Sequence, residues 1–207
     1  MSGKTATRVI LVANPKGGSG KTTLSINLAG YLASQGQRVA MLDLDRQKSA
    51  SQWLAIRDSE LPKIDLLREG QKEHSDWLVI DSPAGLHGKN LERALKLAHK
   101  VVVPIGPSLF DIRASQEFLA ALHAEKAARK GQGFVSVVGM RVDARTRAGV
   151  TLEQFMAQQK LPVLAHLRNT QHYVNAAFEG KSLFDLPHHI AERDIEQWQE
   201  LIDWLNR

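Results

Sequence analysis

The sequence predicts an α/β domain whose mainly parallel, twisted sheet is flanked by helices on both faces. One observation is that several short runs are apolar throughout, as is typical of strands buried on both faces of a parallel sheet. Another is that these runs alternate along the chain with segments of helical spacing. Ligands of such sheets bind at the carboxyl ends of the strands. We therefore expect the functional residues to follow the strands directly.

In the N-terminal half, the elements follow from apolar runs and from helix stops. The run RVILVA at 8–13 predicts a short buried strand. Helical spacing over 21–34 predicts a helix that ends before Gly36, because glycine commonly stops helices. The remaining elements expected here are a strand at 38–42, a helix at 47–57, a weak strand at 63–67 and a clear strand at 77–80.

The C-terminal half continues the same alternation. The run VVVPI at 101–105 predicts another buried strand, and the alanine-rich segment 109–129 predicts a long helix. The remaining elements expected here are a helix at 91–100, a strand at 134–138, a helix at 151–159, a short strand at 163–165 and a final helix at 190–205.

The composition excludes several classes of site. The chain has 207 residues, 43% of them hydrophobic, which suits one domain over residues 1–207 with a sizeable core. It has no cysteine, which excludes disulfides, iron–sulfur clusters, cysteine-based zinc sites and a cysteine nucleophile. The 27 Lys and Arg exceed the 22 Asp and Glu by 5, and this mildly basic balance permits a polyanionic partner. With no export segment or membrane span visible, we expect a cytoplasmic protein.

A glycine-rich segment between the first strand and the first helix has the features of a phosphate loop. It reads NPKGGSGKTT from Asn14 to Thr23. Its glycines let consecutive backbone N–H groups point inward, and the helix that follows adds its dipole. Pro15 stands where the plain G-x-x-x-x-G-K-[ST] pattern has its first glycine, and Lys16 is an additional lysine. The predicted nucleotide-binding residues are Gly17, Gly18, Ser19, Gly20, Lys21, Thr22 and Thr23.

Carboxylates follow two of the predicted strands. Asp43 and Asp45 come at the end of the strand at 38–42, and alternation along a strand puts them on one face. Asp81 ends the apolar run WLVI, which is the Walker B arrangement. Lys21 would reach the β- and γ-phosphates, and the Thr22 hydroxyl would bind Mg²⁺. Asp81 would hold the ion through a water, because Mg²⁺ keeps much of its hydration shell.

These motifs resemble those of the ParA/MinD ATPases, closest to the short ParA-type partition ATPases. KGGSGKTT resembles their deviant Walker A motif, DSPAG their γ-phosphate-sensing switch, and LDLDRQ their D-x-D-P-Q motif, with Arg46 in place of the proline. The resemblance implies that ATP and Mg²⁺ are bound, and that Lys16 reaches the nucleotide of a second copy in a homodimer. It also implies that Asp45 positions the attacking water and that Asp43 lies near Mg²⁺. The implied catalytic residues are Lys16, Lys21 and Asp45, and the implied metal residues are Thr22, Asp43 and Asp81.

Two further segments carry the resemblance. VVPIGPSLFDIR resembles a proline-containing segment of short ParA proteins, which implies a dimer face formed by Lys16, Pro107, Phe110 and Asp111. Basic residues gather between Lys126 and Arg147, where Asp143 is the one acid. Such a surface can bind DNA phosphates without sequence preference. The DNA-binding candidates, which include two residues of a late P-R-N…G-K-like stretch, are Arg141, Arg145, Arg147, Arg168 and Lys181. Arg141 has the adenine pocket as its alternative.

The resemblance implies a slow partition ATPase that binds non-specific DNA as an ATP dimer. A ParB-like or other small partner protein would stimulate hydrolysis, and the cycle would distribute a plasmid, a chromosome region or a protein cargo over the nucleoid. A separate helix-turn-helix domain is not expected at this length. One alternative is a MinD-like membrane ATPase, which the acidic polar side of the last predicted helix disfavours. Another is an ATP-dependent ligase of the same superfamily.

Overall fold

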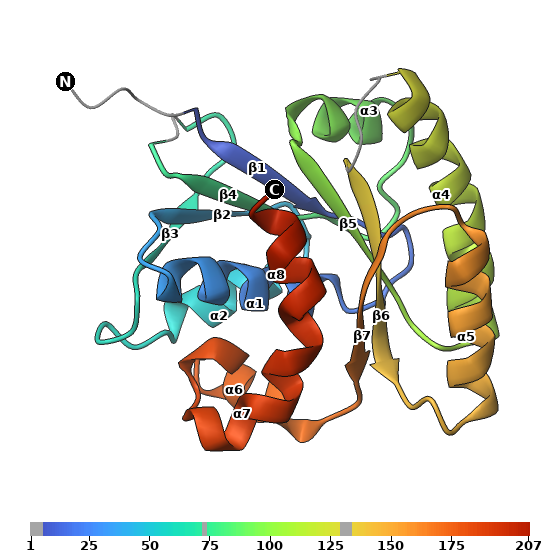
Figure 1. Cartoon of the computed structure of the whole chain (residues 1–207). Coiled ribbons are helices and arrows are strands. Elements are labelled where there is room, and N and C mark those ends of the chain that lie inside the picture. Colours follow the sequence, from blue (N-terminus) through green and yellow to red (C-terminus); the bar gives the residue numbers. More distant parts are fainter. Residues whose placement is uncertain (1–5, 72–73, 129–133) are drawn as a thin grey trace.

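The fold is built on a parallel sheet of seven strands, seen in the computed structural model of residues 6–71, 74–128 and 134–207 (Figure 1). Every neighbouring pair is parallel, in the order β3-β2-β4-β1-β5-β6-β7. The strands are β1 (Arg8–Val12), β2 (Val39–Asp43), β3 (Ile64–Leu67), β4 (Trp77–Asp81), β5 (Lys100–Ile105), β6 (Val135–Val142) and β7 (Val163–Arg168). The predicted α/β class is confirmed.

Helices cover both faces of the sheet (Figure 1). The helices are α1 (Lys21–Ser34), α2 (Ser49–Ala55), α3 (Gly88–Leu97), α4 (Leu109–Ala128), α5 (Arg147–Gln158), α6 (Gln171–Phe178), α7 (His188–Ile195) and α8 (Gln199–Leu205). One core cluster joins the sheet to α1, α2, α6, α7 and α8, and a second joins it to α3, α4 and α5. Short 3₁₀ turns lie at Leu183–Asp185 and Glu196–Trp198.

Alternation along the central strand explains the two cores. In β1, Ile10 and Val12 belong to the cluster with α1, whereas Val9 and Leu11 belong to the opposite cluster. All four side chains are buried, which is why the strand reads as a continuous apolar run. Among the described residues, no helix has the length and apolar character that crossing a membrane requires.

Several predicted elements differ from those observed. The strand predicted at 134–138 continues to Val142, because a β-bulge at Arg141 lets the pairing with β7 persist. The helix predicted at 151–159 begins at Arg147, where the Thr146 side chain accepts a hydrogen bond from Gly149 N. Helix α6 was not predicted, and the final predicted helix is interrupted by the turn at Glu196–Trp198.

The sheet order brings the motifs together at one edge. Strand β4 lies between β1 and β2, so the segments that follow these three strands are neighbours. The register pairs Asp43 with Asp81 and Val12 with Asp81. The phosphate loop and both carboxylate motifs therefore meet at the carboxyl ends of adjacent strands, as the parallel sheet predicts.

Candidate nucleotide site

The phosphate loop between β1 and α1 is tightly curved. Gly18 and Gly20 have φ values of 73° and 94°, in the left-handed region that favours glycine. A Cβ at Gly20 would also lie 2.9 Å from Cε of Met140. Asn14, which is fully buried, accepts a hydrogen bond from Lys16 N at 2.8 Å and donates to Pro104 O and Ser115 Oγ. The loop is thus fixed to β5 and α4.

Lys21 at the start of α1 reaches back across the loop. Its Nζ donates to Lys16 O at 3.0 Å, which closes the loop on itself. Burial lowers the pKa of Lys21, and the nearby carboxylates of Asp81 and Asp45 oppose this effect. A phosphate bound in the loop would add a further negative charge beside this ammonium group and favour its charged form.

Asp81 lies at the centre of the carboxylate cluster. It is completely buried and accepts hydrogen bonds from Thr22 Oγ1 at 2.7 Å and Ser25 Oγ at 3.0 Å. Burial raises the pKa of Asp81 to about 6, despite these hydrogen bonds. A divalent cation beside it would favour the ionised form. Thr22 and Asp81 therefore lie together, as they must if both are to hold one Mg²⁺ ion. Phosphates and water would supply the other ligands of that ion.

Asp43 and Asp45 hold the loop that follows β2. The carboxylate of Asp43 accepts from Asp45 N at 3.1 Å and from both N and Oγ of Ser51, at 2.8 and 2.9 Å. Asp45 accepts from Gln47 N at 2.9 Å, and its side chain lines a cavity beside the phosphate loop. Asp43 therefore orders the loop and α2, while Asp45 faces the space where a nucleotide would lie.

That cavity has a volume of about 960 Å³ and is bounded by all three motifs. Its walls come from the phosphate loop, the loop after β2, the Pro83–Gly85 turn and Arg141. Ser19 and Ser82 contribute buried Oγ atoms that have no hydrogen-bond partner in the described part of the chain. Ser19 also lines the cavity, so a phosphate oxygen would supply the missing partner. The residues fit a nucleoside triphosphate with Mg²⁺. Within the described residues, no group of three or more His, Asp or Glu forms a separate metal site.

Lys16 lies outside this cavity, on the surface next to it. Its Nζ is 3.7 Å from Oδ1 of Asp111 and 6.0 Å from the ring centre of Phe110. Phe110 is 71% exposed, and Leu109 beside it is also exposed. Pro107 is half-buried in the same connection between β5 and α4. The four residues predicted for the dimer face are thus contiguous, and they include an exposed aromatic ring.

The predicted DNA-binding residues do not form one free basic surface. Arg141, at φ 54°, donates to Gly18 O at 2.9 Å and so belongs to the nucleotide cavity. Arg168 pairs with the buried Asp194, and Lys181 pairs with Glu179 at 2.7 Å. Arg145 is exposed and holds Asp143, and Arg147 begins α5 on the surface. Three residues of the predicted basic segment lie outside the described side chains: Lys126, Arg129 and Lys130.

One acidic residue of the last predicted helix, Asp194, is buried and does not belong to the acidic polar side expected for that helix. It is completely buried and accepts from Arg168 Nη2 at 3.1 Å and from His172 Nδ1 at 2.6 Å. Burial alone would raise the pKa of Asp194, but the hydrogen bonds from Arg168 and His172 outweigh it and lower the pKa. Arg168 therefore has a structural partner, which its position in the sequence did not indicate.

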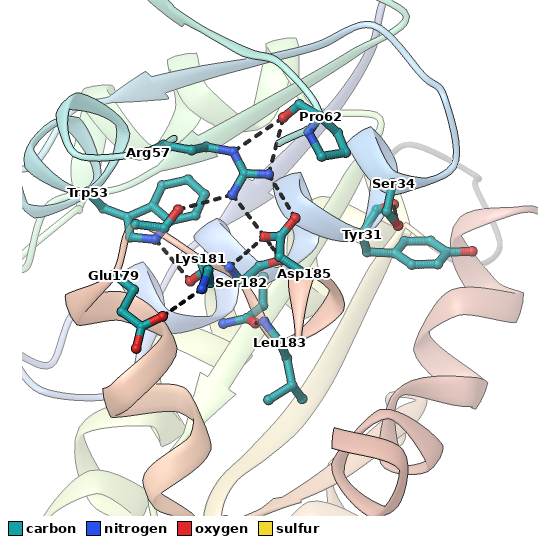
Figure 2. Close-up of polar contacts among 12 residues, drawn as sticks. Tyr31, Ser34, Trp53, Arg57, Pro62, Glu179, Lys181, Ser182, Leu183 and Asp185 are labelled. Atoms are coloured by element: carbon teal, nitrogen blue, oxygen red, sulfur yellow. Dashed lines mark hydrogen bonds and ion pairs between the residues drawn. The ribbon is translucent and has the colours of Figure 1, made fainter. Parts of the chain in front are cut away.

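A buried ion pair anchors the end of α2, immediately downstream of the Asp45 loop (Figure 2). Arg57 and Asp185 have side chains that are only 4% and 1% exposed, and they form two hydrogen bonds of 2.8 and 2.9 Å. Arg57 also donates to Pro62 O and Gly180 O, and Trp53 Nε1 donates to Lys181 O. Sequence reasoning missed this pair because 128 residues separate its members.

Comparison with known proteins decides the family. Residues 10–184 match the family described as the CobQ/CobB/MinD/ParA nucleotide binding domain. The chain belongs to this family. Its ParA and MinD proteins are ATPases, and the predicted resemblance to ParA and MinD is confirmed.

The relatives include several positioning proteins. The chain is 31% identical to the maintenance of carboxysome distribution protein A of Gloeobacter kilaueensis, over 85% of this chain and 83% of that protein. It is 32% identical to the chromosome-partitioning ATPase Soj of Thermus thermophilus, over 58% of this chain and 63% of that protein.

Solved structures share the fold at lower identity. Apo McdA of Cyanothece has a TM-score of 0.76 at 16% identity, covering 95% of this chain and 100% of that chain. The plasmid partition protein of Borrelia burgdorferi bound to AMPPNP has a TM-score of 0.71 at 18% identity, covering 97% and 98%.

Proposed function

We propose that this ParA/MinD-family ATPase is a positioning ATPase that dimerises around ATP and uses Lys16 of each copy on the nucleotide of the other. The observation that carries this proposal is the place of Lys16. It lies outside its own phosphate cavity and next to the exposed Phe110, with its side chain 38% exposed. A cation supplied by a second copy would neutralise the charge that grows on the phosphates during hydrolysis.

Different residues of one chain would bind the phosphates, hold the metal ion and orient the attacking water. The backbone N–H groups of residues 17–23 and the start of α1 would bind the phosphates. Lys21 would contact the β- and γ-phosphates, and Thr22 and Asp81 would hold the metal ion. Mg²⁺, when bound, would neutralise charge on the phosphates. Asp45 lines the cavity and would orient the attacking water, while Asp43 keeps the Asp45 loop in place.

DNA binding belongs to the same proposal. Arg145 and Arg147, in the connection from β6 into α5, are exposed and suit phosphate contacts. Arg168 and Lys181 would add charge only through exposed parts of side chains that already pair with Asp194 and Glu179. We propose that the ATP dimer binds the nucleoid in the cytoplasm, and that a small activating protein releases it. The cargo would be a DNA molecule or a protein assembly, as the names of its relatives suggest.

Dimerisation and hydrolysis test the proposal together. Sedimentation of the chain with MgATP should give a dimer, and with ADP a monomer. Lys16→Ala should keep ATP binding and lose partner-stimulated hydrolysis. Arg38→Ala, which removes an exposed arginine at the other end of β2, is the matched control and should behave like the wild type. Equal stimulated turnover of Lys16→Ala and the wild type would refute the role of Lys16.

DNA binding is tested with MgATP over a salt series. Affinity should fall steeply as salt rises, because Lys and Arg release counterions from DNA when they bind it. The double variant Arg145→Ala, Arg147→Ala should weaken binding to any sequence and flatten the salt dependence. Binding only to anionic vesicles, with none to DNA, would instead favour a MinD-like membrane ATPase.

A further inference from the structure

Arg46 is a cation in the nucleotide cavity whose guanidinium has no partner in the part of the chain that the structure describes. The cavity is lined by three residues with Lys or Arg side chains, namely Lys21, Arg46 and Arg141. Lys21 donates to Lys16 O, and Arg141 donates to Gly18 O. Within residues 6–71, 74–128 and 134–207, the Arg46 guanidinium forms no hydrogen bond or ion pair, and the residue is exposed. Its donors therefore remain available to a ligand.

The backbone on both sides of Arg46 is held in place. Before it, Asp45 N donates to Asp43 Oδ1 at 3.1 Å. After it, Gln47 N donates to Asp45 Oδ1 at 2.9 Å, and Lys48 Nζ donates to Asp43 O at 2.6 Å. These hydrogen bonds fix the backbone around Arg46, while its side chain can still move to contact a ligand.

We propose that Arg46 is a catalytic residue that acts on the nucleotide of its own chain. This rests on the proposed ATPase cycle and adds a second cation to it: Lys16 comes from the partner copy, and Arg46 from the chain that binds the nucleotide. Arg46 directly follows Asp45, and both line the cavity, so its guanidinium would reach the nucleotide from the same wall of the cavity as Asp45.

The planar guanidinium suits the reaction that it would assist. A water oxygen bonds to the γ-phosphorus, and the bond from that phosphorus to the β–γ bridging oxygen breaks with its electron pair going to ADP. One proton of the water passes to solvent, and inorganic phosphate leaves. Arg46 transfers no proton; it donates hydrogen bonds to γ-phosphoryl oxygens, where an arginine fork matches the geometry.

Substitution of Arg46 separates catalysis from binding. Arg46→Ala should lower kcat by about 10- to 100-fold, which is less than for a fully enclosed arginine finger because Arg46 is exposed. The dissociation constant for MgATP should change by less than about threefold. Affinity for ADP with aluminium fluoride, which mimics the transferring phosphoryl group, should fall in step with kcat. Arg46→Lys should recover part of the loss, and Arg38→Ala should match the wild type.

Mixed dimers test whether Arg46 acts within its own chain. Arg46→Ala mixed with Asp45→Ala should show no turnover above that of the two variants measured separately, because each site then lacks one residue of its own chain. Lys16→Ala mixed with Asp45→Ala should regain activity, because the Asp45→Ala copy supplies Lys16 to an intact site. Recovery in the Arg46 mixture, or a kcat of Arg46→Ala within about twofold of the wild type, would overturn the inference. A wild-type chain that binds MgATP without hydrolysing it would instead remove the proposed function itself.

Discussion

Removal of Asp185 should be among the most damaging single changes outside the nucleotide site. The Arg57 guanidinium makes five hydrogen bonds, two to Asp185 and three to the carbonyls of Pro62 and Gly180. In Asp185→Ala it would lose the two charge-assisted bonds and remain 4% exposed with an uncompensated charge. Both N and Oγ of Ser182 would also lose their acceptor. A broken buried pair of this kind costs about 3–5 kcal/mol.

Urea unfolding followed by tryptophan fluorescence measures this loss. With a urea m value of about 2–3 kcal/mol/M, the midpoint should fall by roughly 1–2.5 M. Asp185→Asn, which keeps the shape without the charge, should give an intermediate loss. Asp76→Ala breaks the exposed Arg38–Asp76 pair and is the matched control, which should change the midpoint far less. A loss below about 1 kcal/mol in Asp185→Ala would refute the view that this pair is shielded from solvent.

The pH dependence has a defined sign. Burial alone would raise the pKa of Asp185, but hydrogen bonds from Arg57 and Ser182 outweigh it and hold the pKa below its usual value of 3.8. The contribution of Asp185 to stability is therefore complete above pH 3.8 and is lost as the pH falls through the lower value in the folded protein. Asp185→Ala should lack this part of the acid destabilisation.

Three other predictions concern single sites. Gly30→Ala should destabilise the chain by about 1–3 kcal/mol, because the added Cβ would overlap the Ser182 side chain. Adding Ser182→Gly should recover part of this loss, and an unchanged urea midpoint in Gly30→Ala would contradict the prediction. Burial raises the pKa of Asp81 from 3.8 to about 6, which corresponds to about 3 kcal/mol against the charged form. Asp81→Asn should therefore unfold at a higher temperature without ligand, yet no longer be stabilised by MgATP; a lower unliganded melting temperature would count against this. Arg168→Ala should lower the free energy of unfolding by about 1–3 kcal/mol even without DNA, because Asp194 would stay buried and would keep only its contact with His172 among the described residues. A variant as stable as the wild type would mean that Arg168 has no structural role and remains available to bind DNA.

The phosphate loop could be predicted from sequence because its chemistry is local. Ten consecutive residues carry the glycines, Lys21 and Thr22, and they lie between a strand and a helix in the structure as expected. The carboxylates could be predicted because each directly follows an apolar strand. A parallel sheet gathers such positions at one edge, so no contact between them had to be known in advance.

Contacts between distant residues could not be predicted in this way. The sequence analysis lists Arg168 as a DNA-binding candidate, yet Arg168 pairs with the buried Asp194, 26 residues away. The extension of β6 beyond the predicted 134–138 depends on a bulge that places Arg141 at φ 54°, where it donates to Gly18 O of the phosphate loop. Helix α6 had one usable signal, because Thr170 caps it by accepting from His172 N.

The exchange of Lys16 between two copies is the centre of the proposed function, and one measurement tests it most directly. ATP turnover is measured for Lys16→Ala, for Asp45→Ala and for their equimolar mixture, each with MgATP and the activating partner or DNA. Each variant alone should be inactive, and the mixture should regain activity, because the Asp45→Ala copy donates Lys16 to a site with its own Asp45 intact. A mixture that forms dimers but stays inactive would contradict the transfer of Lys16 between copies.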